Sequence, residues 1–170
     1  MGFINKKPEP RDDENLYERF RQRVLDMKLT EDLETCIDGR SVYAAVVDMD
    51  MKTTTVTLIC VADGTTSLYY SNGGGQIGLG QADPEIAKAT VTFLRDADPV
   101  LNRLKKTEEC PLPKHGKHRV YLLTRHATYQ YEFNHETIRE ESRETQYLFF
   151  LYQNVLTKIG EYNQKDSLKN

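Results

Sequence analysis

The fold is decided by residues 42–71, VYAAVVDMDMKTTTVTLICVADGTTSLYYS, which contain three strand-like segments in a row. Residues 42–49 are almost wholly apolar, as in a strand that is buried on both faces. Residues 54–62 are rich in threonine and β-branched side chains. An Asp-Gly pair at 63–64 indicates a two-residue hairpin turn, after which residues 66–71 form the third strand. Such short links join antiparallel strands, because a parallel pair needs a long crossover.

Further helices and strands flank this three-stranded segment. Apolar residues that recur every three or four positions predict a helix over 12–34. An Asp-Pro pair at 83–84 predicts the N-cap and first position of a second helix. Residues 119–124 and 128–133 predict two more strands, and residues 135–162 a last long helix. The predicted order is α-β-β-β-α-β-β-α, an α+β fold with a single five-stranded antiparallel sheet and flanking helices.

Length and composition exclude several classes of protein. The 170 residues suit one domain, which we expect over 12–163, with a disordered tail at 1–11 and a frayed tail at 164–170. A formal net charge of −3 argues against nucleic-acid binding through bulk positive charge. No apolar run approaches the roughly 20 residues of a membrane span. Three cysteines without a C-x-x-C pair favour a cytoplasmic protein without disulfides.

Residues 72–81 hold five of the ten glycines. Gly73, Gly75 and Gly78 match G-x-G-x-x-G, but that motif needs its third glycine inside the first turn of a helix. The proline at 84 places the start of the next helix after the G-x-G-x-x-G motif, so no dinucleotide or other cofactor is expected. Two interpretations stay open: the glycines allow tight reversal close to the sheet, or their N–H groups bind a small ligand or peptide. The candidate ligand-binding residues are Asn72, Gly73, Gly74, Gly75, Gly78 and Gly80.

The same region resembles the signature of a family of uncharacterised bacterial proteins. DGTTSLYYS at 63–71, the glycines that follow it, and RVYLLT at 119–124 carry the resemblance, which spans 42–124. The signature can be written D-G-T-x-S-L-Y-x-S-x-G-G-G. It implies a bacterial cytoplasmic protein and brings no activity, cofactor or catalytic residue. As an analogy of fold only, the element order is also similar to roadblock/longin-type (profilin-like) modules and to small dimeric chaperones of type III secretion.

Basic residues concentrate at 103–126, where seven Lys or Arg and two Glu give a local balance of +5. Two interpretations of this segment stay open: it binds an acidic partner or phosphates, or it is a solvated face. In the same segment Cys110, His115 and His118 have the spacing C-x4-H-x2-H. No fourth ligand stands at a standard spacing, so no metal site is predicted. The candidate basic patch consists of Lys105, Lys106, Lys114, Lys117 and Arg119.

The last predicted helix carries six apolar or aromatic residues in a row, YLFFLY at 147–152. Six residues cover more than one helical turn, so no single face can bury them all. Either the helix is central to the monomer or another chain covers one side. We favour a homodimer or another protein partner, with candidate interface residues Tyr147, Phe150, Leu151 and Val155.

No nucleophile, base and orienting group stand at a recognisable spacing, so no catalytic residue is predicted. The favoured function is a non-enzymatic protein-interaction or small-ligand-binding module that forms a homodimer. One alternative is an enzyme that uses the glycine-rich segment, for which Asp48, Asp63, Arg125 and His126 are the places to look. A second alternative is an inhibitor or immunity-type protein that blocks a partner with a charged face.

Overall fold

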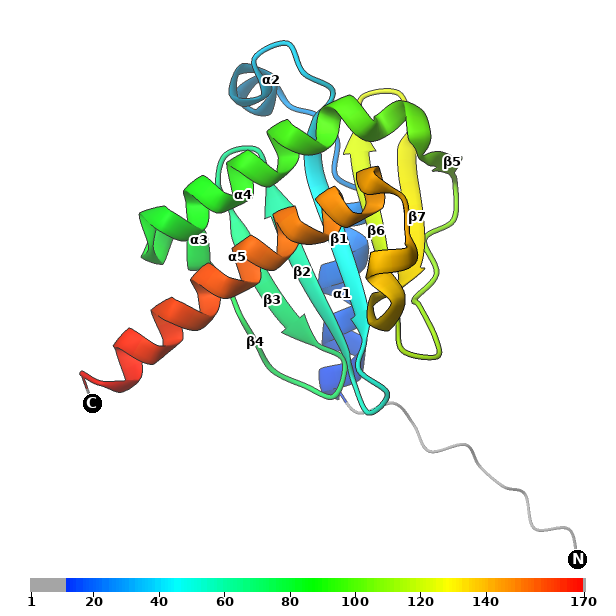
Figure 1. Cartoon of the computed structure of the whole chain (residues 1–170). Coiled ribbons are helices and arrows are strands. Elements are labelled where there is room, and N and C mark those ends of the chain that lie inside the picture. The colour runs from blue at the N-terminus through cyan, green and yellow to red at the C-terminus, as the bar shows by residue number, and fades with distance from the viewer. Residues whose placement is uncertain (1–11, 170) are drawn as a thin grey trace, which may run out of the picture.

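The computed structural model describes residues 12–169, with side chains from Leu16 onward. Within this part, seven strands form one antiparallel sheet in the order β4-β3-β2-β1-β6-β7-β5. Figure 1 shows helices α4 and α5 side by side across one face of the sheet and α1 across the other. The α+β class is confirmed, and the sheet is the middle layer of three. No described helix combines the length and the apolarity that crossing a membrane requires.

The three strands expected from residues 42–71 form the predicted antiparallel meander. They are β1 (Val42–Asp50), β2 (Thr55–Val61) and β3 (Thr66–Tyr70). Strand β1 also pairs with β6 (Lys117–Thr124), so it is the central strand and is buried over nearly its whole length. This position explains its continuous apolar sequence, because both of its faces are covered.

The prediction of a five-stranded sheet is wrong, because two short edge strands extend it to seven within the described residues. Strand β4 (Gly75–Gln76) pairs with β3. Strand β5 (Lys105–Thr107) pairs with β7 (Thr128–Asn134), which follows β6 in a hairpin. Two or three residues carry no alternation of their own, so each short strand is defined only by its partner across the sheet.

The predicted first helix is also corrected, because it consists of two helices. Helix α1 (Asp12–Leu25) ends before α2 (Glu31–Ile37), and the Thr30 side chain caps α2 by accepting a hydrogen bond from the Leu33 N–H. Thr30 therefore starts a new helix where the periodicity of apolar residues suggested one continuous helix. The disordered tail predicted for 1–11 lies outside the described residues.

The later helices lie near their predicted positions, and short helices precede or extend them. Asp83 caps α4 (Pro84–Ala97), as predicted, and the one-turn helix α3 (Leu79–Ala82) precedes it. A 3-10 helix, η1 (Asp98–Arg103), continues α4. The last predicted helix begins as the 3-10 helix η2 (His135–Glu140) and becomes α5 (Arg143–Ser167) after a cap at Ser142. Helix α5 thus reaches into the segment expected to fray.

The two faces of the sheet differ in what covers them. On the α4–α5 face, Thr90 of α4 hydrogen-bonds Thr66 at 2.6 Å, and Tyr152 of α5 hydrogen-bonds His118 at 2.7 Å. The opposite face carries the buried polar side chains Asp48 of β1 and Thr57 of β2, and it is covered by α1 and by residues 108–113.

Candidate binding slot beneath helix α1

Helix α1 rests on the sheet through one narrow stripe. Tyr17 and Arg21 are buried and Phe20 is half-buried, whereas Glu18, Arg19 and most of the other described side chains of the helix are exposed. Positions three and four apart share one face of a helix, so these three side chains point together at the sheet. They hold α1 by two different means, a polar network and an aromatic stack.

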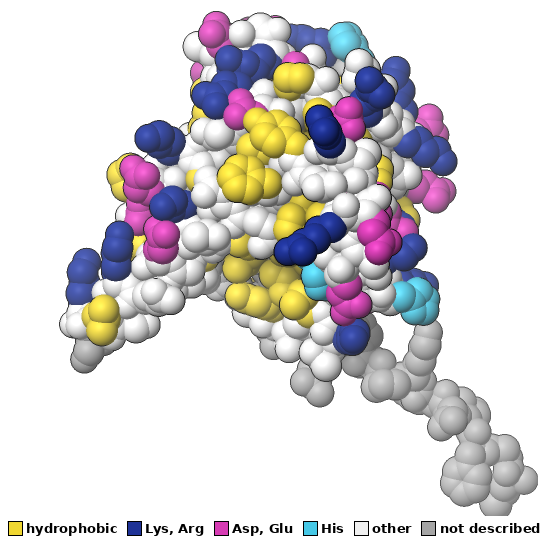
Figure 2. All heavy atoms as spheres, in the orientation of Figure 1, with side chains coloured by type: hydrophobic (Ala, Val, Ile, Leu, Met, Phe, Trp, Pro, Cys, Tyr) yellow, Lys and Arg dark blue, Asp and Glu magenta, His cyan; other side chains and the backbone are white. Residues whose placement is uncertain are grey.

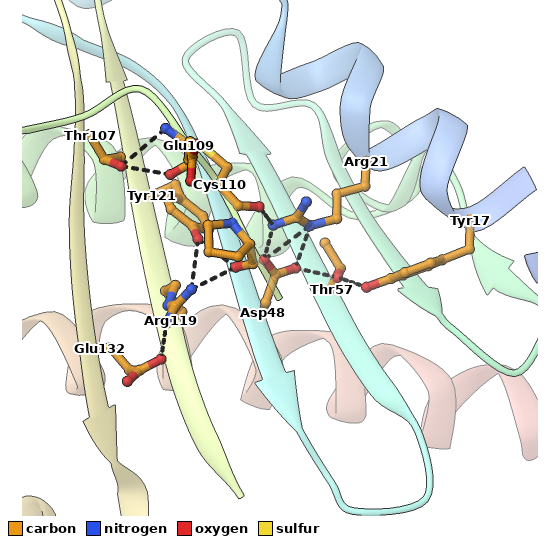
Figure 3. A network of polar contacts seen from close by, with 11 residues as sticks. Tyr17, Arg21, Asp48, Thr57, Thr107, Glu109, Cys110, Arg119, Tyr121 and Glu132 are labelled. Carbon is orange, nitrogen blue, oxygen red and sulfur yellow. Dashed lines mark hydrogen bonds and ion pairs between the residues drawn. The ribbon is translucent and has the colours of Figure 1, made fainter. Parts of the chain in front are cut away.

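The polar network is centred on Asp48 of β1, whose side chain is 0 % exposed (Figure 3). Arg21 donates from Nε to both carboxylate oxygens, at 3.1 and 3.0 Å, and from Nη2 to Oδ2 at 2.6 Å. The Thr57 hydroxyl donates to Oδ1 at 2.6 Å and therefore accepts from the Tyr17 hydroxyl, 2.7 Å away. Arg21 Nη2 also donates to the Cys110 carbonyl at 2.7 Å.

The polar groups of Asp48, Thr57 and Arg21 are engaged with one another. Burial lowers the pKa of Arg21, but the hydrogen bond and charge of Asp48 outweigh it and raise the pKa overall. Burial, followed by the charge of Asp48, raises the pKa of Tyr17 to about 12. Asp48 accepts from two residues at Oδ1 and twice from Arg21 at Oδ2, so its oxygens are occupied. This arrangement is a clamp that fixes α1 on the sheet.

The loop that follows β5 is tied to the same face. Tyr121 donates from its hydroxyl to the Pro111 carbonyl at 2.6 Å, and Arg119 donates to that carbonyl at 2.9 Å. Arg119 also pairs with Glu132 of β7 (Figure 3). The Arg21 guanidinium lies 5.7 Å from the centroid of the Tyr121 ring, a cation–π contact that joins the two halves of the network.

A slot of about 180 Å³ opens between α1 and the glycine-rich segment. Phe20 of α1 stacks on Tyr69 of β3 along it, with ring centroids 5.3 Å apart and planes 14° apart. Two apolar side chains at its rim face solvent: Leu16 is 44 % exposed and Ile77 is 69 % exposed. The walls are almost entirely apolar and are formed by Leu16, Tyr17, Phe20, Tyr69, Tyr70, Gly74, Gly75 and Ile77.

The glycine-rich segment has a structural part and a part that faces the slot. A Cβ on Gly80 would lie 1.9 Å from the Gly64 carbonyl oxygen, so Gly80 allows α3 to pack against the β2–β3 turn. Gly75 lines the slot and also passes close to the Leu68 backbone, and Gly74 lines the slot at a φ of +84°. The other predicted ligand-binding residues, Asn72, Gly73, Gly78 and Gly80, do not line it.

The aromatic walls were missed by reasoning from the sequence. Leu16 and Phe20 were interpreted as the core face of a helix, and Tyr69 as one residue of a strand. Only the packing of α1 across β3 brings them together. The available signal was Ile77, a large apolar residue within a glycine-rich segment that offers it little cover.

The predicted basic patch is not one continuous surface of free charges. Lys117 and Arg119 both pair with Glu132, and the Lys106 ammonium lies 5.8 Å from the centroid of the Tyr129 ring. Lys105 and Lys114 are exposed on β5 and in the loop that precedes β6. Two of the five predicted cations are thus already paired.

The four residues considered for an enzyme are not assembled into one constellation. Asp48 lies in the clamp, and Asp63 caps the β2–β3 turn by accepting from the Thr65 N–H at 2.9 Å. Arg125 and His126 lie in the β6–β7 hairpin, where Arg125 pairs with Glu34. Among the side chains described, those of residues 16–169, no three of His, Cys, Asp or Glu are grouped so that they could hold a metal ion.

The predicted interface residues of α5 divide into two pairs. Leu151 and Val155 are buried by the chain itself, so they offer no area to a partner. Tyr147 and Phe150 are exposed, and Phe150 is 64 % exposed. Figure 2 shows hydrophobic side chains at the surface of this helical layer.

Comparisons with known protein families, with curated proteins and with solved structures find no match for this chain. Its site is therefore interpreted from geometry and chemistry.

Proposed function

We propose that this protein is a non-enzymatic interaction module that seats one large apolar side chain of a partner protein in the slot between α1 and the glycine-rich segment. The observation that carries this proposal is an apolar slot of about 180 Å³ whose rim keeps Leu16 and Ile77 exposed to solvent. Exposed apolar side chains around a concavity are typical of a binding surface.

The size of the slot favours a side chain over a metabolite. Sites for small molecules usually measure about 300–1,000 Å³, whereas a cavity of about 150 Å³ accepts a single benzene ring. One phenyl or indole ring, or a branched aliphatic chain, therefore fills the slot. Binding energy at protein interfaces is concentrated in such anchor residues, which enter well-packed pockets.

The walls of the slot are held in place before a partner arrives. The clamp of Tyr17 and Arg21 fixes α1, and Tyr69 belongs to a strand that is paired on both sides. A preformed site loses little conformational entropy on binding, which raises affinity for a given contact area.

The chemistry of the slot argues against catalysis there. Among the described residues, its lining holds no His, Cys, Asp, Glu, Lys or Arg, and the ionisable side chains that line it are the tyrosines Tyr17, Tyr69 and Tyr70. The Tyr17 hydroxyl donates to Thr57 and has a pKa of about 12, so it is a poor acid or base at neutral pH. The alternative of an inhibitor that blocks a partner with a charged face differs from this proposal, because the slot is apolar.

The test is a selection of random displayed heptapeptides against the wild-type protein and against Ile77→Asp. We expect the selected peptides to share one aromatic or large aliphatic residue and to bind Ile77→Asp at least about tenfold more weakly. Met51→Asp is the matched control, because Met51 is also an exposed apolar residue and lies in the β1–β2 turn, outside the slot. Peptides that bind both variants equally, or no enrichment at all, would contradict the proposal.

Self-association through α5 is a second candidate, favoured by the exposed ring of Phe150. Tyr147, one turn earlier on the same helix, is also exposed. These two side chains would form the apolar centre of an interface between two copies.

A further inference from the structure

We propose that the protein has a second binding site, a groove beside the β6–β7 hairpin that takes a small molecule with an apolar body and a phosphate or carboxylate group. Two hollows of about 330 and 310 Å³ make up the groove. They share Leu29, Thr124, Arg125 and His126, so they adjoin beneath the tip of the hairpin. Each hollow lies in the size range of small-molecule sites, unlike the slot beside α1.

The charges that line the groove favour an anion. Lys28, Arg40 and Arg125 are cationic, whereas Glu34 is the one carboxylate among the described residues of the lining. Neither Lys28 nor Arg40 forms an ion pair with any residue in the described part of the chain. A groove lined mainly by one sign of charge attracts ligands of the opposite sign.

Apolar side chains stand beside these charges in the larger hollow and suit the body of the ligand. Leu29, Ile37 and Leu101 line the larger hollow, and the Tyr129 ring lies beside them. The Lys106 ammonium is 5.8 Å from the centroid of that ring, which favours a fixed position for Tyr129. An inorganic anion alone would leave these walls without contact, so we expect an amphiphilic ligand to bind better.

The ion pair between Arg125 and Glu34 allows the site to be tested by mutation, because its two charges should affect ligand affinity in opposite directions. Both side chains are about half exposed, 50 % and 55 %, and pairs exposed to this degree are weak. A phosphate or carboxylate can therefore replace the Glu34 carboxylate at the Arg125 guanidinium, where it gains charge-assisted hydrogen bonds. Removing the Glu34 charge should consequently strengthen binding of the ligand, whereas removing the Arg125 charge should weaken it.

The experiment follows amide NMR shifts of residues 124–128 during titration with phenyl phosphate and, separately, with benzoate. These two probes distinguish a phosphate site from a carboxylate site. Inorganic phosphate and phenol are titrated as well, because they represent the anionic and the apolar half of phenyl phosphate. We expect phenyl phosphate or benzoate to bind more tightly than inorganic phosphate and more tightly than phenol. Arg125→Gln should weaken binding about tenfold and Glu34→Gln should tighten it about threefold.

Arg143→Gln is the matched control, because Arg143 is an exposed arginine at the start of α5 and does not line the groove. It should leave the affinity unchanged. The proposal is overturned if neither probe shifts residues 124–128, if phenol binds as well as phenyl phosphate, or if Arg125→Gln and Arg143→Gln have the same effect. Shifts confined to Gly74 and Ile77 would also overturn it, since they report the slot beside α1.

Discussion

At the scale of single residues, the most costly feature of this protein is the buried pair of Arg21 and Asp48. Taking two charges out of water is unfavourable unless good geometry and further hydrogen bonds compensate for it. Thr57 and the Cys110 carbonyl supply such bonds. We infer that the pair is kept because it specifies one rotation and one position of α1 on the sheet, which a purely apolar contact would specify less sharply.

Arg21→Met should reduce the free energy of unfolding by about 3–5 kcal/mol, because Asp48 would be left buried without its counter-ion. The double variant Arg21→Met/Asp48→Asn should recover about 1–2 kcal/mol, since no buried charge remains. Urea denaturation measures both values. Arg23→Met, at an exposed position on the same helix, should change stability by less than about 0.5 kcal/mol. Equal effects of Arg21→Met and Arg23→Met would contradict the clamp.

A second buried polar residue, His118, lies on the opposite face of the sheet. Its Nδ1 is 2.7 Å from the Tyr152 hydroxyl, and its ring stacks on His135 with centroids 4.5 Å apart. Its Nε2 has no hydrogen-bond partner within the described residues. Burial, followed by the neighbouring His135, lowers the pKa of His118 to about 4 against an opposing effect of Asp50.

This lowered pKa predicts a loss of stability in mild acid. Between pH 6.5 and 4 the unfolded chain binds a proton at His118 and the folded chain does not, so protonation favours unfolding. The contribution is complete above pH 6.5 and falls by about 2–3 kcal/mol as the pH drops to 4. Denaturation at a series of pH values should show a smaller slope for His118→Gln. The exposed His126→Gln should keep the wild-type slope; identical slopes for all three proteins would refute the assignment.

At the scale of elements, the glycine-rich segment is both a packing device and one wall of the slot. Gly80 allows α3 to lie against the β2–β3 turn, while Gly75 allows β4 to pair closely with β3. The packing interpretation therefore holds for Gly80 and Gly75, whereas ligand binding by this segment stays a prediction.

Gly80→Ala should destabilise the protein by about 3 kcal/mol, because its Cβ would overlap the Gly64 carbonyl and the backbone must move. Gly160→Ala is the matched control in α5. A Cβ there meets no atom of the described structure within 4 Å, so alanine should stabilise the helix by about 0.5–1 kcal/mol. Thermal unfolding compares the two variants. A Gly80→Ala protein as stable as the wild type would show that this contact is not tight.

Elements with a strong local pattern could be predicted, and elements that depend on pairing could not. The meander followed from apolar runs and the Asp63-Gly64 turn, and the start of α4 followed from Asp83 and its proline. The strands β4 and β5 depend on their neighbours in the sheet. The break before Thr30 was hidden because apolar residues continue through it at helical spacing.

The candidate site was predicted only in part for the same reason. The glycine-rich segment could be identified, because its five glycines are visible in the sequence. Its aromatic partners, Phe20 and Tyr69, are 49 positions apart and meet only when α1 crosses the sheet. The groove at the hairpin likewise combines Lys28, Arg40 and Arg125, which local spacing does not connect.

At the scale of the whole molecule, the sheet separates a well-covered face from a thinly covered one. Helices α4 and α5 cover one face together, whereas α1 and one loop cover the other (Figure 1). The slot lies at the β3–β4 edge and the groove beside β6 and β7, so the two proposed sites lie toward opposite edges of the sheet. A ligand in one should not block the other.

The helical layer is where self-association is expected. Phe150→Glu places a charge in the exposed apolar cluster of Tyr147 and Phe150 on α5, so it should shift a dimer toward the monomer without loss of fold. Light scattering over a range of concentrations measures the mass of both proteins. Lys158→Glu, a charge change on α5 away from this cluster, should leave the mass unchanged. A wild-type protein that is monomeric throughout would rule out this second candidate.

Titration with indole followed by amide NMR shows directly whether the slot beside α1 accepts one apolar ring. We expect saturable shifts confined to residues that line the slot, with Gly74, Gly75 and Ile77 among the largest. Ile77→Asp should weaken these shifts, while Met51→Asp should not. Shifts that never saturate, that spread evenly over the surface, or that persist unchanged in Ile77→Asp would show that the slot is not a binding site for such a ring.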